Sequence, residues 1–381
     1  MIVTTLYILA CVLLFSLAIA IHEFGHFIVA LKLGLRVEAF SIGFGPVLWK
    51  KTVNGVEYRI SAIPLGGYVS IPDVDPEGTK KLEGGGKTDE NLRERIPAWK
   101  EILVALAGPA MNVVLAVVIA VLLSIAPGAR FGELPAKIGF VPEGGPADAA
   151  GIKAGDTVLS VAGRPVYTWT EMQTEVQITG GKAAKFVVSR PDEGEIELTV
   201  VPKRDDVTGA FFIMALSVTN ESGAVAWMPD RNPLKQLAWD AGSIFRILKG
   251  LVTPEEAKAT ANALGGAVSI AEGIYASLRR NAWDGLGFLR FLNVNLAIIN
   301  LLPIPVLDGG LVLFALIALV FRRRVPDKVV NVLSTGFMYL LIALMAILIF
   351  KDSRRSWKIH TRKSGDTTNV VERADSSTED R

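Results

Sequence analysis

The sequence predicts an α-helical membrane protein that crosses the bilayer several times and carries a soluble insert. Half of its 381 residues are hydrophobic, and the mean hydropathy of +0.39 is higher than is usual for a soluble protein. Residues 2–21 contain no charged side chain, whereas residues 351–381 are mostly polar. Residues 130–203 have a mixed polar and apolar composition with regular turns, which is typical of a small soluble domain.

The same composition excludes several other classes of protein. It does not fit a small secreted disulfide scaffold, a coiled coil or a disordered chain. Cys11 is the single cysteine and cannot form an internal bridge, so packing alone must hold any extracytoplasmic domain. The net charge of +2 gives no reason to expect a nucleic-acid partner.

Four apolar segments are long enough to span a bilayer, which needs about 20 residues. They are expected at residues 2–33, 102–126, 286–321 and 329–350. The Ala18-Ile19-Ala20 sequence is typical of a signal-peptide cleavage site. However, no basic residue precedes it and the apolar run continues past His26, so we expect the first segment to be retained.

Basic residues in short loops predict the orientation of these spans. They gather at residues 32–51 and 93–100, between the first two spans, and at 322–328, between the last two. Both loops are therefore predicted to be cytoplasmic, and residues 127–285 to lie outside. The tail is the exception, because four spans place it outside although it begins with several basic residues.

The predicted organisation has seven parts. Glycines, aromatic residues and the alternation at 56–60 predict a membrane-associated β-hairpin within 36–72, followed by a loop at 73–95. Strand-like runs around 158–161, 186–188 and 196–200, with a short helix at 170–178, predict an α+β domain. The parts are a first transmembrane helix (1–35), the β region and loop (36–100), a second transmembrane helix (101–127), the small domain (128–204), an extracytoplasmic linker with an amphipathic helix (205–285), the third and fourth transmembrane helices (286–350) and a polar tail (351–381).

The first span contains the pattern His22-Glu23-Phe24-Gly25-His26. Residues four apart share one face of a helix, so both imidazoles can bind one metal ion, and zinc binds histidine nitrogen readily. Glu23 would then lie beside the metal, where it can take a proton from water. The alternative is a structural polar cluster, which is disfavoured because ionisable groups are costly in a bilayer unless partners compensate them.

A catalytic zinc site needs a third protein ligand, and the remaining histidine, His360, lies in the tail. Asp308 is the carboxylate within the later apolar segments, and Pro303, Pro305 and the following glycines predict a broken helix around it. Such a turn is tolerated at membrane depth only against protein or a water-filled cavity. Asn300 precedes this break and is a candidate to contact substrate or orient a ligand. The alternative for Asp308 is a helix-end cap in a cytoplasmic loop.

These two motifs together resemble the site-2 protease family of intramembrane zinc metalloproteases, and most of all the bacterial regulator of sigma-E proteases. The resemblance implies that His22, His26 and Asp308 bind Zn²⁺, that Glu23 is the catalytic base and that Asn300 contacts substrate. It also implies a substrate-binding role for Gly43-Phe44-Gly45-Pro46, at the start of a β-hairpin near the active site. Residues 107–112 match the family motif that opens the second span.

Residues 145–163 resemble a bacterial PDZ domain, a module that binds extended chain ends by adding a strand to a sheet. The sigma-E proteases usually carry two such domains, whereas this chain has one, and residues 204–230 are too few for a complete second copy. Gly265-Gly266 lacks a proline common in the family, and Leu311 replaces a residue that is often polar.

The leading hypothesis is an intramembrane zinc endopeptidase that acts in regulated intramembrane proteolysis. It is expected in the bacterial cytoplasmic membrane, where lipid surrounds it, with the PDZ-like domain outside the cell. Its expected substrates are single-span proteins such as anti-sigma factors or remnant signal peptides, and its PDZ-like domain is expected to bind extracytoplasmic chain ends. A catalytically silent PDZ membrane scaffold is the alternative, but it would not need the four site residues. A zinc transporter would be expected to have a His-rich loop, which the sequence lacks.

Overall fold

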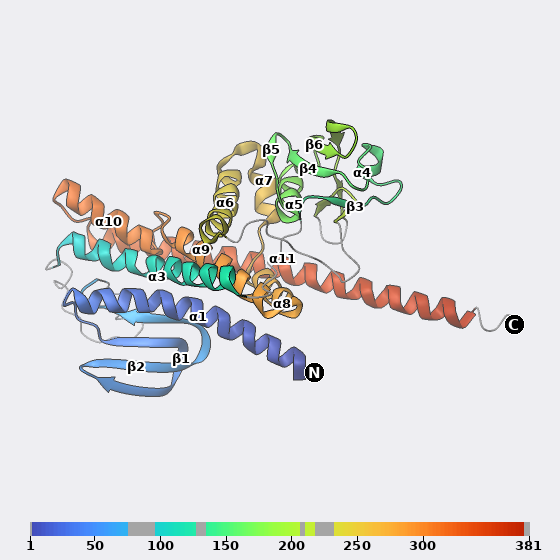
Figure 1. The fold of residues 1–381 in the computed structure, drawn as a ribbon. Coiled ribbons are helices and arrows are strands. Elements are labelled where there is room, and N and C mark those ends of the chain that lie inside the picture. The colour runs from blue at the N-terminus through green and yellow to red at the C-terminus, as the bar shows by residue number, and fades with distance from the viewer. Residues whose placement is uncertain (1, 75–95, 127–134, 206–209, 218–231, 377–381) are drawn as a thin grey trace. The chain divides into compact units, whose positions relative to one another are not determined.

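The computed structural model describes residues 2–74, 96–126, 135–205, 210–217 and 232–376 (Figure 1). The chain divides into two compact units. The first comprises residues 1–129, 230–244 and 273–342, and the second comprises residues 130–229, 245–272 and 343–381. The predicted loop at 73–95 and residues 204–230, which are too few for a complete second PDZ domain, lie largely outside the described residues.

The first unit is built around one long apolar helix, α3 (Ala98–Ile125). It packs against α1 (Ile2–Lys32), α9 (Ala282–Asn300) and α10 (Asp308–Phe321), and Figure 1 shows it lying between α1 and the later pair. Its buried face carries small residues such as Ala107 and Gly108, which allow neighbouring helices to approach closely. This central position brings segments that are distant in sequence to one place.

Three helices among the described residues are long and apolar enough to cross a membrane, namely residues 9–32, 98–125 and 328–354. Helix α10 is apolar but shorter, with 14 residues. The third predicted segment, 286–321, is divided because α9 ends at Asn300 and α10 begins at Asp308, with turns between them. The two prolines explain the break, because each removes a backbone N–H donor and fixes φ.

The β region consists of two long strands, β1 (Ala39–Val53) and β2 (Val56–Ser70), and both change register along their length. Residues 39–42 pair with 57–60 on one side and with 67–70 on the other, while residues 47–53 pair with 56–61. The predicted hairpin is therefore a small sheet of four segments. In the described pairing, residues 67–70 form one of its edges.

The second unit contains a small α+β fold with its own core. Its main sheet has the order β5-β4-β6-β7, formed by β5 (Arg164–Pro165), β4 (Thr157–Val161), β6 (Ala184–Arg190) and β7 (Gly194–Val200). Helix α5 (Trp169–Ile178) begins with a capping box of Thr168 and Glu171, which satisfies two backbone donors. Phe186, Val158 and Met172 form the centre of the core. Short elements complete the unit: β3 (Ile138–Phe140), α4 (Pro146–Ala149), β8 (Lys203–Arg204), β9 (Phe211–Phe212) and β10 (Leu216–Ser217).

A buried ion pair stabilises this unit. Arg190 in β6 donates to both oxygens of Asp156, at 2.8 and 2.9 Å, and the Asp156 side chain is 0% exposed. Burial opposes ionisation of this carboxyl group, but the Arg190 guanidinium outweighs it and holds the pKa of Asp156 below its usual value. The pair fixes the turn before β4 against the sheet.

The predicted linker at residues 205–285 contains more helix than expected. In place of one amphipathic helix there are three, α6 (Pro233–Val252), α7 (Pro254–Ala263) and α8 (Ala267–Arg280). Within the second unit, Arg246 bridges Glu175 of α5 and Glu256 of α7. These contacts attach α7 and the end of α6 to the α+β fold.

The last helix, α11 (Asp327–Ser376), also differs from the prediction, because it continues well past residue 350, where the fourth span was expected to end. Hydropathy falls after this point while helix geometry continues. A change in polarity alone does not end a helix in the absence of a proline or a glycine cap.

We expect Phe186→Ala to destabilise the second unit by about 3–5 kcal/mol, because the ring is fully buried and its removal leaves a cavity. Hydrogen exchange of the β4, β6 and β7 amides in the full chain should accelerate strongly. Val201→Ala, at a position 58% exposed, is the control and should leave exchange nearly unchanged. Equal exchange in wild type and Phe186→Ala would contradict this description of the core.

Candidate metal centre

Helix α1 places His22 and His26 one turn apart on the same face. Their Nε2 atoms are 3.2 Å apart, and the two rings are nearly perpendicular, at 82°. The residues are only 8% and 9% exposed. Two imidazole nitrogens thus meet in a buried place, as the four-residue spacing predicts.

Asp308 completes the cluster from the first turn of α10. One carboxylate oxygen, Oδ2, lies 3.2 Å from His22 Nε2, and the other, Oδ1, lies 3.4 Å from His26 Nε2. These three side chains form a group of potential ligands whose atoms all lie within 4.8 Å of one another. Two ligand atoms bound to one tetrahedral zinc ion are separated by about 3.3 Å, so this donor set fits zinc.

The Asp308 carboxylate gives a second reason to expect a bound metal ion here. Asp308 Oδ2 is buried and has no hydrogen-bond donor among the described residues. A buried carboxylate oxygen without a partner is costly in a protein interior. A bound cation would satisfy it.

The outer nitrogen of each imidazole is held by α3. His26 Nδ1 lies 2.7 Å from the carbonyl oxygen of Val104. Because a carbonyl can only accept, Nδ1 carries the proton and Nε2 keeps its lone pair for a metal. His22 Nδ1 lies 3.1 Å from Nδ2 of Asn112, a residue that is 0% exposed.

The Asn112 amide also has an unused acceptor, since its Oδ1 is buried and unpaired among the described residues. Rotation of the amide by 180° exchanges Oδ1 and Nδ2. In that orientation Oδ1 accepts from His22 Nδ1–H and leaves Nε2 free to bind a metal. Asn112 is therefore placed to set the proton position on His22.

Glycines allow the helices to approach this closely. A Cβ added to Gly108 of α3 would lie 2.3 Å from His26 Nε2, and one added to Gly25 of α1 would lie 2.3 Å from the Ala107 carbonyl oxygen. Any side chain at Gly108 would occupy the space of the imidazoles. The pair of glycines thus determines how near α3 comes to the two histidines.

Glycines also shape the turn that carries Asp308. A Cβ on Gly309 would lie 2.2 Å from the Leu302 carbonyl oxygen, and one on Gly310 would lie 2.3 Å from that of Ile304. The segment between α9 and α10 therefore folds tightly over the first turn of α10. This folding directs the Asp308 carboxylate towards α1.

Glu23 follows His22 on α1 and faces the small sheet. The backbone of Val69 hydrogen-bonds its carboxylate, and the Cγ of Glu23 is 3.5 Å from the position of a Cβ on Gly67. Both partners belong to the edge segment of β2. The carboxylate thus lies between the histidine pair and this sheet edge.

Asn300, the last residue of α9, also reaches the cluster. Its Nδ2 lies 3.4 Å from His22 Nε2. The structure therefore brings together five of the predicted site residues, namely His22, Glu23, His26, Asn300 and Asp308.

Residues 43–46 are placed differently. They lie on β1, where Gly43 and Gly45 have positive φ angles of 90° and 82°, and the ring of Phe44 stacks on Tyr68. The contacts described above between the sheet and Glu23 come from Gly67 and Val69 instead. A role for residues 43–46 in substrate binding stays a prediction.

Comparison with known proteins agrees with this geometry. Residues 10–344 match the model of Peptidase family M50. The chain belongs to peptidase family M50. The predicted site-2 protease relationship is thereby confirmed over nearly the whole chain.

Individual relatives agree with the family match. Two bacterial proteins bear the name "putative zinc metalloprotease": one from Campylobacter jejuni is 30% identical over 91% of this chain and 93% of its own, and one from Clostridium perfringens is 31% identical over 91% and 98%. The chloroplastic membrane metalloprotease ARASP of Arabidopsis thaliana is 33% identical over 91% of this chain and 78% of its own. The family and these names confirm the predicted enzyme class, a metalloendopeptidase, and the predicted cofactor, Zn²⁺.

Sequence reasoning did not assign functions to Asn112 and Gly108, although it noted the motif that contains them. An asparagine in an apolar span is itself a signal, because a polar side chain in a membrane helix needs a partner. The identity of that partner, His22, is 90 residues away and depends on how the helices pack.

We expect Asn112→Leu to weaken zinc binding by about 10–100-fold, because an acceptor for His22 Nδ1–H is lost. Asn112→Asp retains an acceptor and should bind zinc much more tightly than the leucine variant. Both are measured on the purified full chain by competition with a zinc chelator.

Asn293→Leu is the matched control, since Asn293 is also 0% exposed but its amide bonds the Leu289 carbonyl within its own helix. Wild-type zinc affinity in Asn112→Leu would show that Asn112 does not orient His22.

Proposed function

We propose that this M50 peptidase cuts the transmembrane segments of single-span membrane proteins inside the bilayer. The observation that carries the proposal is the buried convergence of His22, His26 and Asp308 from two apolar helices. In the proposal these three side chains hold zinc, and the fourth position of the metal is left for water or substrate. The relatives named zinc metalloproteases support this assignment.

The chemistry divides between the metal and the chain. When bound, zinc polarises a carbonyl oxygen and acidifies a nearby water molecule. Glu23 accepts the proton of that water and later donates it to the leaving amine of the cut peptide bond. Its position beside the two histidines, with the backbone of Val69 orienting the carboxylate, suits this role.

Asn300 acts on the substrate in this proposal. Its amide lies at the cluster and offers both a donor and an acceptor to an extended backbone. The adjoining turn at residues 301–307 presents non-helical backbone beside the site. Such backbone at membrane depth is stable where it borders protein or a water-filled cavity, which hydrolysis requires.

A transmembrane substrate must unwind before it is cut, because a helix uses its carbonyls in internal hydrogen bonds. The edge of the small sheet at residues 67–70 offers a place for the unwound segment. Since the backbone N–H of Val69 donates to Glu23 and the backbone groups of alternate residues in a strand face the same side, those of Gly67 face this side as well. A substrate strand added there would lie beside the catalytic groups.

The second unit supports a role in selecting substrates. We interpret residues 128–204 as the PDZ-like domain that binds extracytoplasmic chain ends. With the orientation predicted from the basic loops, the enzyme lies in the bacterial cytoplasmic membrane and acts after a first cut outside. Anti-sigma factors and remnant signal peptides are the proposed substrates of this regulated intramembrane proteolysis.

The two alternative functions are less well supported. A catalytically silent scaffold would not need a donor set that fits zinc with a carboxylate beside it. A zinc transporter would need ligands that lead across the membrane, whereas the described ligand group is a single cluster.

We expect Glu23→Gln to lower the rate of cleavage of a model single-span substrate by at least about 10²–10⁴-fold, because glutamine cannot take the proton from water. Zinc stoichiometry should be unchanged, since Glu23 is not a proposed ligand. The measurement compares purified wild type and variant in detergent or vesicles, with metal content determined on the same samples.

Glu195→Gln, at an exposed position of β7, is the matched control and should cleave like wild type. Equal processing by wild type and Glu23→Gln would refute the protease mechanism proposed here.

If the substrate binds as an added strand, only every second backbone N–H of the substrate bonds the sheet edge. N-methylation of alternate substrate amides next to the cut should raise KM for one set of positions, whose N–H groups face the sheet edge, and leave the other set nearly unaffected. The assay uses synthetic substrates with single N-methyl groups and measures KM and kcat separately. An equal effect at all positions would contradict binding as an added strand.

A further inference from the structure

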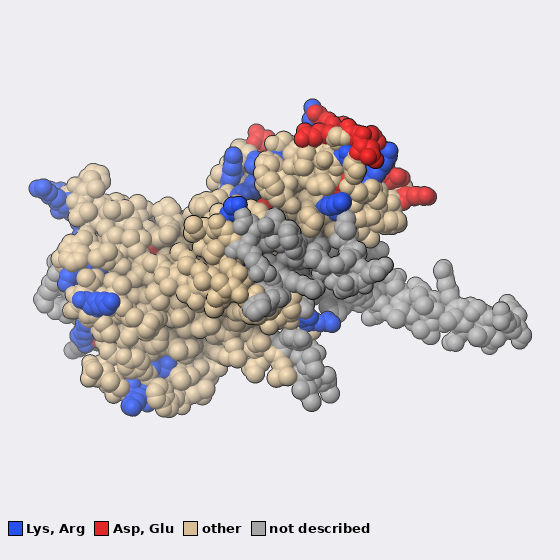
Figure 2. Space-filling view, viewed as in Figure 1, with Lys and Arg blue, Asp and Glu red and all other residues tan. Residues whose placement is uncertain are grey.

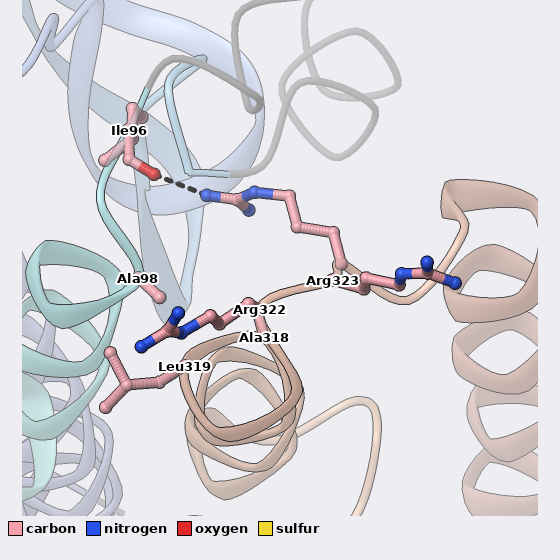
Figure 3. Close-up of a pocket in the computed structure, with 7 residues that line it drawn as sticks. Ile96, Ala98, Ala318, Leu319, Arg322 and Arg323 are labelled. Carbon is pink, nitrogen blue, oxygen red and sulfur yellow. Dashed lines mark hydrogen bonds between the residues drawn. The ribbon is translucent and has the colours of Figure 1, made fainter.

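A surface pocket of about 420 Å³ lies between the beginning of α3 and the end of α10 (Figure 3). It belongs to the first unit and is at the opposite end of α10 from Asp308. Three consecutive arginines contribute to its wall together with apolar residues of both helices. The lining residues are Ile96, Ala98, Ala318, Leu319, Arg322, Arg323 and Arg324.

Arg324 has a structural role in this wall. Its guanidinium donates to Glu101 Oε1 at 2.8 Å and to the carbonyl oxygen of Ile96. Glu101 is only 3% exposed, so its carboxylate needs this partner. Arg324 thereby connects the loop after α10 to the first turn of α3 and forms a fixed side of the pocket.

Arg322 and Arg323 have no such partner. Both are exposed, and neither side chain forms an ion pair or hydrogen bond with another residue in the described part of the chain. The Glu101 carboxylate is already engaged by Arg324. Two positive charges in the pocket wall are therefore left to attract an anion.

The backbone at the end of α10 directs the Arg322 and Arg323 side chains to different sides. Arg322 ends α10 in a left-handed conformation, with φ of 52°, which is costly for a residue other than glycine. Figure 3 shows Arg322 extending over Leu319 towards Ala98, while Arg323 extends to the opposite side. The Arg322 guanidinium thus lies at the pocket beside Leu319 and Ala98, whereas that of Arg323 lies on the far side.

The surroundings of the pocket are apolar and exposed. Leu319 and Phe321 at the end of α10 are 54% and 70% exposed, and Trp99 at the beginning of α3 is 48% exposed. In Figure 2, lysine and arginine side chains gather at this end of the first unit, while the surface along its helices is mainly free of charge. Tryptophan next to a ring of basic side chains is typical of a helix end at the membrane–water interface.

We propose that this pocket binds the phosphate group of an anionic phospholipid. The Arg322 guanidinium contacts the phosphate oxygens, since guanidinium groups donate to phosphate in bidentate geometry, and Arg323 adds a second positive charge to the pocket wall. The acyl chains lie along the exposed apolar surface formed by Leu319 and its neighbours. Basic pockets between membrane helices bind anionic head groups in the same manner.

The surroundings favour a lipid over a free phosphate compound. A soluble anion would use only the arginines and would leave the apolar surface next to them exposed. A phospholipid uses both surfaces together, because its phosphate is covalently attached to chains that occupy the bilayer. The pocket and the exposed leucine and phenylalanine side chains lie at one helix end, which matches that arrangement.

The experiment measures lipid binding to the purified full chain in detergent by native mass spectrometry. Phosphatidylglycerol is the anionic probe, and phosphatidylcholine with the same acyl chains is the neutral one. We expect wild type to bind phosphatidylglycerol about tenfold more tightly than phosphatidylcholine, and Arg322→Gln/Arg323→Gln to lose most of this preference. Circular dichroism and thermal unfolding check that the variant is folded.

Lys50→Gln/Lys51→Gln is the matched control, because it removes the same amount of exposed positive charge from β1. It should retain the preference to within about twofold, whereas a pure net-charge effect would reduce it as much as the arginine variant does. Equal losses in the two double variants, or no preference in wild type, would overturn the proposal.

A competition arm distinguishes the two possible sources of phosphate. Inorganic phosphate at about 10 mM should leave most of the bound phosphatidylglycerol in place, because the acyl chains add to the affinity. Complete displacement by inorganic phosphate would overturn the assignment to a lipid. None of these measurements depends on proteolytic activity.

Discussion

The structure depends on holding His22, His26 and Asp308 together among apolar helices. Each of these groups is costly to bury without a partner, and their shared position allows one bound cation to serve all three. The requirement extends outward, because the imidazoles need fixed proton positions and the carboxylate must approach from another helix. Val104, Asn112 and the tight turn before Asp308 meet these needs. The packing of α1, α3 and α10 can therefore be understood as support for one small cluster.

The same constraint explains the irregular backbone around the site. Hydrolysis needs water and an extended substrate, but exposed backbone polar groups are not tolerated in lipid. The chain places two non-helical features beside the cluster: the turn between α9 and α10, and the edge of the sheet formed by β1 and β2. Glu23 lies between the histidines and that edge. The carboxylate proposed as the catalytic base and the sheet edge proposed to hold an unwound substrate are thus neighbours.

The charged residues of α10 lie only at its two ends, which suits a helix in a membrane. Asp308 stands at its beginning, where the helix dipole favours a negative group, and three arginines follow its last residue. Its 14 residues correspond to about 20 Å of helix, which is shorter than the bilayer core. A short helix that begins at a buried site and ends among arginines is anchored at both ends, by the cluster and by the contacts of Arg324 with α3.

The sequence alone predicted the chemistry of this protein, because the spacing of His22, Glu23 and His26 and the small number of histidines can be read directly from it. With few histidines available, the H-E-x-x-H pattern predicted two metal ligands and a base, and Asp308 among prolines and glycines predicted a third ligand beside a helix break, of which the break is present in the structure. The tertiary structure decided which residues distant in sequence contact these predicted site residues. The proximity of Asn112 to His22, the clearance at Gly108, the four-segment pairing of the sheet and the engagement of Arg324 by Glu101 all depend on packing between helices or strands. Periodicity shows which face of a helix is apolar, but the partner of each side chain is fixed only when the helices pack at a particular depth and rotation.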